Sequence, residues 1–145
     1  MKNREMIACI NNLDAILTQE RDRPVNERIF NGRAFLLMNR NLRSLLEEYR
    51  ANYEKDLQIL KEKFYTKKEK EVIIPADPEN GTKEHKEKKS IEVLKPNCTQ
   101  EQYDKELNEL LDLETRKIQI SKIKADDLAD VRDYAVAIAL DFMVE

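Results

Sequence analysis

The stretch from Leu42 to Phe64, LRSLLEEYRANYEKDLQILKEKF, decides the fold. It contains neither proline nor glycine, and its apolar residues recur every three or four positions, which is the spacing of one face of an α-helix. Two successive repeats of eleven residues on this face predict a nearly straight helix. The helical pattern extends outward over residues 25–66. The residues of the face are Leu42, Leu46, Tyr49, Tyr53, Leu57, Leu60 and Phe64.

Three further segments predict helices, at residues 3–18, 99–114 and 125–143, because each places apolar side chains on one helical stripe. The segment at 99–114 has the clearest start. Thr99 and Gln102 form a capping box, in which the Thr99 hydroxyl accepts a hydrogen bond from the Gln102 amide and the Gln102 side chain reaches back to the Thr99 amide. We therefore expect this helix to begin directly after Thr99.

Residues 70–95 have a different pattern. Apolar and polar residues alternate at both ends of the segment, which predicts two short strands, and Asn80-Gly81 between them favours a turn. We expect an antiparallel β-hairpin with a mobile tip. An isolated hairpin is marginally stable in water, so this one should dock on a helix or pair with another strand. The alternation at 116–120 allows a third strand.

Length and composition support one domain over residues 1–145. The chain is 38% charged and 41% hydrophobic, with two glycines and no tryptophan. This profile suits solvated helices and argues against a β-sandwich or barrel. The predicted fold is mainly α, with a long central helix in a helical bundle or hairpin and a small antiparallel β-hairpin or three-stranded sheet. No apolar run approaches the ~20 residues of a membrane span, so we expect a cytoplasmic protein.

The sequence lacks the residue patterns that enzymes use. His85 is the single histidine and lies within a charged run, and no nucleophile elbow, zinc-protease or phosphate-loop motif occurs. Cys9 and Cys98 fit no metal spacing. We expect them to be unpaired thiols, with a disulfide between them as the alternative. The sequence therefore predicts a non-enzymatic protein that binds no cofactor and no metal ion.

Two charged clusters are candidate partner-binding surfaces. The arginines share a helical face that is either a phosphate-binding stripe or a solvated face paired with acidic side chains. The aspartates either mimic phosphates or hold a metal ion, or they are ordinary acids in the first turn of a helix. The candidate residues are Arg33, Arg40, Arg43, Arg50, Asp126, Asp127 and Asp130.

Charge is divided unevenly along the chain. Residues 1–70 carry fifteen basic and eleven acidic side chains, a net charge of +4, whereas residues 71–145 carry eleven and eighteen, a net charge of −7. Halves of opposite sign favour either folding back within one chain or head-to-tail self-association.

Four pieces of sequence, taken in order, resemble a known family. They are a leading helix containing Ile10–Asp14, Pro24-Val25 before a long charged helix ending near Glu62–Tyr65, the segment Gln102–Leu111 followed by Ile118–Ile120, and the terminus Ala139–Glu145. Together they are similar to small helical proteins encoded by tailed phages and prophages of Gram-positive bacteria. The resemblance implies a phage origin and transfers no activity and no site residue.

These observations lead to three functional hypotheses. The first is a phage accessory protein that acts in the host cytoplasm by protein–protein binding, in virion assembly or as a chaperone, with a phage structural protein or a host protein as partner and a homo-oligomer as a further possibility. The second is an inhibitor of a host nuclease or defence complex, acting by acidic charge mimicry. The third and weakest is nucleic-acid binding through the arginine face.

Overall fold

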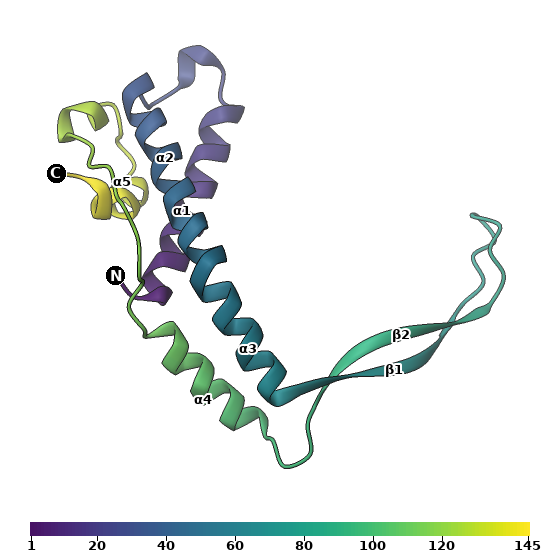
Figure 1. Ribbon diagram of the computed structural model, residues 1–145. Helices are drawn as coiled ribbons and strands as arrows, with labels where there is room; N and C mark the ends of the chain where they lie inside the picture. The colour runs from purple at the N-terminus through teal and green to yellow at the C-terminus, as the bar shows by residue number, and fades with distance from the viewer. The chain divides into compact units, whose positions relative to one another are not determined.

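The computed structural model describes residues 1–145 and shows a mainly α fold with one two-stranded antiparallel sheet (Figure 1). This confirms the predicted fold class. A π-helical turn, Tyr49–Tyr53, joins two of the helices into one continuous helix from Gly32 to Phe64. The elements are α1 (Asn3–Asp22), α2 (Gly32–Glu48), α3 (Glu54–Phe64), β1 (Tyr65–Ile74), β2 (His85–Leu94), α4 (Gln100–Leu111) and α5 (Tyr134–Leu140).

The chain forms two compact units. Unit 1 comprises Met1–Asp56 and Glu109–Glu145, and unit 2 comprises Leu57–Asn108. The boundaries fall inside helices α3 and α4. One folding domain over residues 1–145 stays a prediction.

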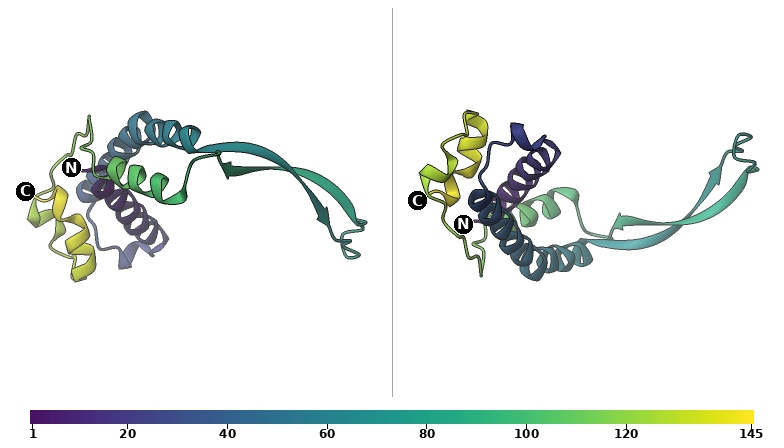
Figure 2. Two further views of the ribbon diagram at one scale, coloured as in Figure 1. Left: turned by 90° about the horizontal axis from the view of Figure 1, so that it is seen from below. Right: turned by 90° about the horizontal axis from the view of Figure 1, so that it is seen from above.

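The core of unit 1 lies where α1 and α2 pack side by side, as both views in Figure 2 show. The C-terminal residues return to this core through a short parallel bridge: the Ile123 amide donates to the Met143 carbonyl at 2.7 Å, and the Glu145 amide donates to the Ile123 carbonyl at 2.9 Å. The fully buried apolar side chains are Met6, Leu13, Leu17, Ala34, Met38, Leu45, Ile123, Leu140 and Met143.

The long helix buries a different face from the one that its apolar spacing predicts. Between Gly32 and Glu48 the buried side chains are Ala34, Met38, Asn41, Leu45 and Glu48, whereas Leu42, Leu46 and Tyr49 are only half-buried. The π-helical turn holds one residue more than an α-helical turn and so moves the buried face along to Tyr53 and Phe64, as predicted for these two. Apolar spacing predicted the wrong buried face for α2 because two of its buried side chains, Asn41 and Glu48, are polar.

The long helix also begins later than residue 25. Val25–Glu27 form a 3₁₀ turn, and residues 28–31 are not helical, with Arg28 and Asn31 extended. Helix α2 starts at Gly32, where the Asn31 side chain accepts a hydrogen bond from the Ala34 amide at 2.8 Å. The buried Glu20 carboxylate holds the extended segment by accepting from the Ile29 and Phe30 amides. Glu20 is still helical because α1 continues to Asp22, four residues beyond the predicted end.

The predicted helix at 125–143 is broken into three short pieces. Ala125–Leu128 form a 3₁₀ turn, α5 spans only Tyr134–Leu140, and Asp141–Met143 form a second 3₁₀ turn. Asp133 is extended, and its side chain accepts hydrogen bonds from the first amides of α5. Aspartate competes with helical hydrogen bonding through such local bonds, so an acid-rich segment starts a new helix here.

Unit 2 contains the predicted hairpin, with longer strands. β1 and β2 pair in register from Tyr65 opposite Leu94 to Ile74 opposite His85. At the tip, Asp77 and Thr82 exchange two backbone hydrogen bonds of 3.0 Å each, and Gly81 adopts a positive φ of 69°, which its missing Cβ allows. The predicted turn at Asn80-Gly81 is therefore confirmed.

The predicted capping box of α4 is confirmed in both directions. The Gln102 amide donates to the Thr99 hydroxyl at 3.2 Å, and the Thr99 amide donates to the Gln102 side chain at 3.1 Å. The same helix places the Tyr103 ring edge-on against Phe64 and Tyr65, with ring centroids 5.8 and 5.1 Å away. The cap thus orients the helix that packs at the base of the hairpin.

Replacing Thr99 by alanine should cost about 1 kcal/mol of stability, because the Gln102 amide loses the hydroxyl that accepts its hydrogen bond. Hydrogen exchange should show faster exchange at the start of α4, while α1 and α2 stay unchanged. Thr99→Ser retains the hydroxyl and should behave like wild type. Equal exchange in the alanine and serine variants would show that the cap contributes nothing.

Candidate functional site

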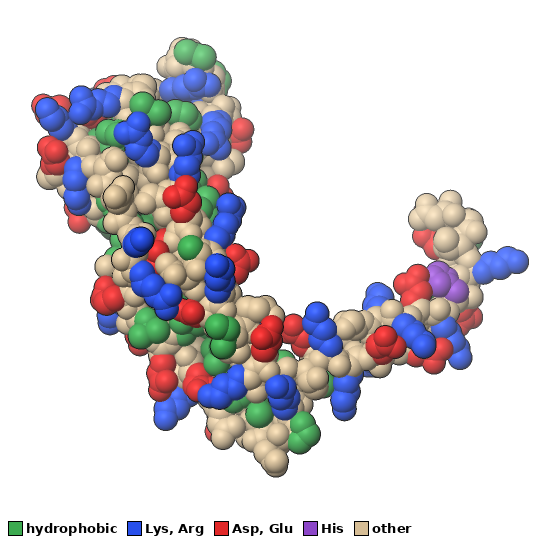
Figure 3. Space-filling view, in the orientation of Figure 1, with side chains coloured by type: hydrophobic (Ala, Val, Ile, Leu, Met, Phe, Trp, Pro, Cys, Tyr) green, Lys and Arg blue, Asp and Glu red, His purple; other side chains and the backbone are tan.

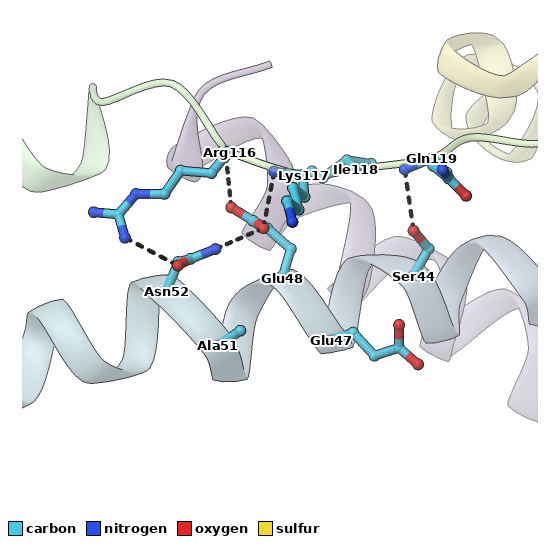
Figure 4. Close-up of a pocket in the computed structure, with 9 residues that line it drawn as sticks. All are labelled: Ser44, Glu47, Glu48, Ala51, Asn52, Arg116, Lys117, Ile118 and Gln119. Atoms are coloured by element: carbon cyan, nitrogen blue, oxygen red, sulfur yellow. Dashed lines mark hydrogen bonds between the residues drawn. The ribbon is translucent and has the colours of Figure 1, made fainter.

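Residues 116–121, here called the strap, lie extended along α2 in unit 1. Their first two amides are held by one carboxylate: the Arg116 amide donates to Glu48 Oε1 at 2.7 Å and the Lys117 amide donates to Glu48 Oε2 at 3.1 Å (Figure 4). The Gln119 amide donates to the Ser44 hydroxyl at 3.2 Å. Side chains of a helix thus take the place of a partner strand.

The end of the strap is held by an amide side chain. Asn41, which is fully buried, accepts from the Ser121 amide at 2.7 Å and donates to the Ser121 carbonyl at 2.9 Å. This is the pair of bonds that a neighbouring strand would make. The third strand allowed at 116–120 is therefore wrong. The segment is extended as its alternation indicates, but its partners are Asn41, Ser44 and Glu48 rather than backbone.

Glu48 is the most heavily engaged carboxylate of this region. Burial alone would raise its pKa, but hydrogen bonds from the Arg116 amide, the Asn52 side chain and the Lys117 amide, together with the Arg116 charge, outweigh burial and hold the pKa below its ordinary value. The Arg116 guanidinium in turn donates to Asn52 at 2.9 Å and pairs with Asp56 at 3.2 Å. The carboxylate is thus ionised and satisfied.

A polar groove of about 630 Å³ lies beside the strap, with Glu47 and Lys117 among its lining residues. Of its other lining groups, Ser44, Glu48, Asn52 and Arg116 are already engaged in the hydrogen bonds described above (Figure 4). The groove holds no nucleophile beside a base and no pair of free carboxylates. Its polar groups serve to fix the strap on the helix.

The four candidate arginines all lie on the exposed side of the long helix. Arg33 pairs with Asp127 at 3.6 Å, as expected if this arginine belongs to a solvated face that is paired with acidic side chains. Arg40, Arg43 and Arg50 are exposed and form no ion pair. The four arginines therefore lie on one side of the helix, and Arg33 forms an ion pair within the protein.

The three candidate aspartates are adjacent but not equivalent. Asp127 is held in unit 1 by Arg33 and by the Asn31 side chain, which donates to it at 3.3 Å. Asp126 and Asp130 are exposed. They do not lie in the first turns of a long helix as predicted, because the helix is broken there. No group of three or more His, Cys, Asp or Glu side chains is placed to hold a metal ion.

The remaining reactive side chains are isolated. His85 is exposed on the hairpin, where the Lys83 carbonyl and the Glu87 side chain bond to its ring and raise its pKa. Cys9 and Cys98 are unpaired, in agreement with the prediction. Burial and the nearby Glu5 charge raise the pKa of the Cys9 thiol, so Cys9 is less readily ionised than an ordinary cysteine.

The ribbon, defined as β1 and β2 together, is the least covered part of unit 2. Most of its side chains are exposed on both faces, and charged groups of both signs follow it in Figure 3. Opposite residues of an antiparallel pair share a face, so the register separates two faces. Sequence reasoning predicted the hairpin but did not separate these faces, because they follow only from the exact pairing.

The two faces of the ribbon differ in composition. One face, here called the lysine face, combines aliphatic side chains with three lysines: Val72, Ile74, Ile91, Val93, Lys68, Lys70 and Lys89. The other face sets opposite charges across the strands, with Lys67 opposite Glu92 and Glu71 opposite Lys88, and also carries Ile73, which is 59% exposed. At its base this second face is covered, because Tyr65 packs on Tyr103.

No helix of this protein is both long enough and apolar enough to cross a lipid bilayer. In comparisons with known proteins, no family model, no curated protein and no solved structure matches this chain.

Proposed function

We propose that this chain is a non-enzymatic protein that acts by binding another protein through the ribbon. In the setting that its sequence resemblance implies, it is a phage accessory protein working in the host cytoplasm, in virion assembly or as a chaperone. The observation that carries the proposal is the ribbon itself, which has two ten-residue strands with largely exposed faces.

The low intrinsic stability of an exposed two-stranded sheet supports a binding role for the ribbon. Two isolated strands are marginally stable in water, and exposed strand edges invite pairing with other chains. The lysines along both strands limit indiscriminate pairing, while Val72 with Ile74 and Ile91 with Val93 leave two aliphatic clusters on one face. An element that excludes random partners and keeps apolar clusters is suited to a specific partner.

The absence of a reactive arrangement is consistent with this role but does not carry it. The polar groove beside the strap is satisfied internally, and the arginine side of the long helix has one member, Arg33, engaged by Asp127. Of these three features, the ribbon is the one whose side chains contribute least to holding the fold together.

The test is capture of partners from nuclease-treated lysate of infected host cells, using the tagged chain and identifying co-purifying proteins by mass spectrometry. In the short-ribbon variant, residues 69–90 are replaced by Asn-Gly, which joins the paired residues Lys68 and Ile91 through a two-residue turn. We expect this variant to lose phage structural proteins by about tenfold or more relative to the full chain.

The matched control removes only the tip. Replacing residues 75–84 by Asn-Gly joins Ile74 to His85, which are also paired, and keeps both strands. This control should capture the same proteins as the full chain, and circular dichroism should show unchanged helix content in both variants. Equal capture by the short-ribbon variant would contradict the proposal. Capture of a host nuclease or defence subunit would instead favour the inhibitor hypothesis.

A further inference from the structure

We infer that the lysine face of the ribbon docks on the acidic, apolar surface around α5 of a second copy of this chain, so that copies associate head to tail. This inference rests on the proposed function and names one partner of the ribbon, which is the protein itself. Each of the two surfaces is defined within its own unit, the ribbon in unit 2 and α5 in unit 1.

The lysine face has a net positive charge and two aliphatic clusters, Ile91 with Val93 and Val72 with Ile74, on either side of its central lysine pair. Lys68, Lys70 and Lys89 face the same side, and Lys70 lies directly opposite Lys89. The only carboxylate on this face is Glu87, which bonds to the ring of His85 at 2.9 Å. At about 3.3 Å per residue, ten residues make a face about 33 Å long. This is enough to contact a short helix and its flanks.

The surface around α5 is apolar, and the sequence around it has the opposite net charge. The helix contains no charged side chain, and its outward residues Tyr134 and Ile138 are 86% and 74% exposed. They lie one helical turn apart, on the side away from the buried Leu140. Together these two side chains give the turn an exposed apolar surface that a partner can cover.

The sequence on either side of this apolar turn is mainly acidic, although Lys122 also lies nearby and donates to the Phe142 carbonyl at 2.7 Å. Residues 125–145 contain six acidic side chains and one basic side chain, Arg132. Asp130 and Asp141 are exposed and form no ion pair, while Asp133 caps the helix. The α5 segment combines exposed apolar side chains with net negative charge, and the lysine face combines aliphatic side chains with net positive charge. Such complementarity determines which surfaces associate.

Charge also excludes the symmetric arrangements. Two lysine faces would place their lysines against one another, and two α5 surfaces would do the same with their aspartates; like charges across an interface are unfavourable. The association therefore joins two different surfaces. A head-to-tail interface of this kind closes into a ring or continues as a filament.

The first experiment measures self-association by sedimentation velocity, from about 5 to about 200 μM protein and in low and high salt. We expect oligomers that grow with concentration and weaken as salt rises, because salt screens exposed charges. Removing three charges with K68Q/K70Q/K89Q should weaken association by about tenfold. The matched control K67Q/K86Q/K88Q removes the same charge from the other face and should change association little.

The second experiment exchanges the charges. K68E/K70E/K89E alone and D130K/D141K alone should each be monomeric, and an equimolar mixture should associate again because every contact then joins opposite charges. Tyr134→Ser with Ile138→Ser should also weaken association at unchanged circular dichroism. Monomers at every concentration, an equal effect of the control, or a mixture that stays monomeric would overturn the inference. In those cases lysate capture by the intact ribbon would still support the proposed function.

Discussion

Replacing Glu48 by alanine is expected to lower the free energy of unfolding by about 3 kcal/mol. Glu48 is 3% exposed and accepts from the amides of Arg116 and Lys117 and from the Asn52 side chain. The variant leaves two strap amides and an amide side chain without their acceptor. The hydrogen bonds from both strap amides are part-buried, and a donor partly removed from water without a partner is costly, so we expect the strap to detach locally before the whole unit unfolds.

Glu47→Ala is the matched control, because Glu47 is the neighbouring glutamate on the same helix and is exposed. It should change the free energy of unfolding by less than about 0.5 kcal/mol. Urea unfolding measures the difference, and hydrogen exchange at residues 116–121 reports the strap directly. Equal stability of the two variants would refute the structural role of Glu48.

Acid should remove the same contribution in the wild type. Because the folded-state pKa of Glu48 lies below its ordinary value of 4.5, its stabilisation is fully present above that value and is lost as pH falls through the lower, folded pKa. The stability gap between wild type and Glu48→Gln should therefore be constant from about pH 7 to about pH 5 and shrink below that range. A gap that widens on acidification would contradict this linkage.

Replacing Leu45 by alanine is expected to cost between about 2 and about 5 kcal/mol. Leu45 on α2 is fully buried, so its truncation removes buried apolar surface and leaves a cavity. Leu36 lies on the same helix and is 57% exposed, and Leu36→Ala should cost less than about 1 kcal/mol. Thermal or urea unfolding of both variants makes the comparison.

Leu46→Ala adds a sharper comparison at the adjacent position. Apolar spacing alone assigns Leu46 to the buried face, whereas the structure leaves it half-buried and buries Leu45. We therefore expect Leu46→Ala to cost clearly less than Leu45→Ala. The reverse order would restore the face predicted from the spacing.

Local patterns in the sequence were sufficient for several elements. The capping box of Thr99 and Gln102 needs only residues three positions apart, and it is present as predicted. The hairpin was also predicted, because its alternation and the Asn80-Gly81 turn are local signals. Its two unlike faces, which carry the proposed function, required the register between strands that are separated by the whole turn.

The candidate charged residues were only partly informative. The spacing of the arginines predicts that they share an exposed side of the long helix. The structure exposes all four, Arg33, Arg40, Arg43 and Arg50. The engagement of Asp127 by Arg33 and Asn31 was not predictable at the level of atoms, because it joins residues about a hundred positions apart. The apolar exposure of Tyr134 and Ile138 was likewise missed, because a continuous helix was predicted there.

By itself, the sequence determined the presence of the long helix, where α4 begins and where the hairpin turns, since these depend on spacing and on hydrogen bonds between near neighbours. The tertiary structure alone decided what the polar residues do. Glu20, Asn41 and Glu48 are buried because extended segments far away or across a loop present amides that need an acceptor. Whether a polar side chain of a helix is buried depends on such a distant partner. The residues near it in the sequence therefore do not show that it is buried.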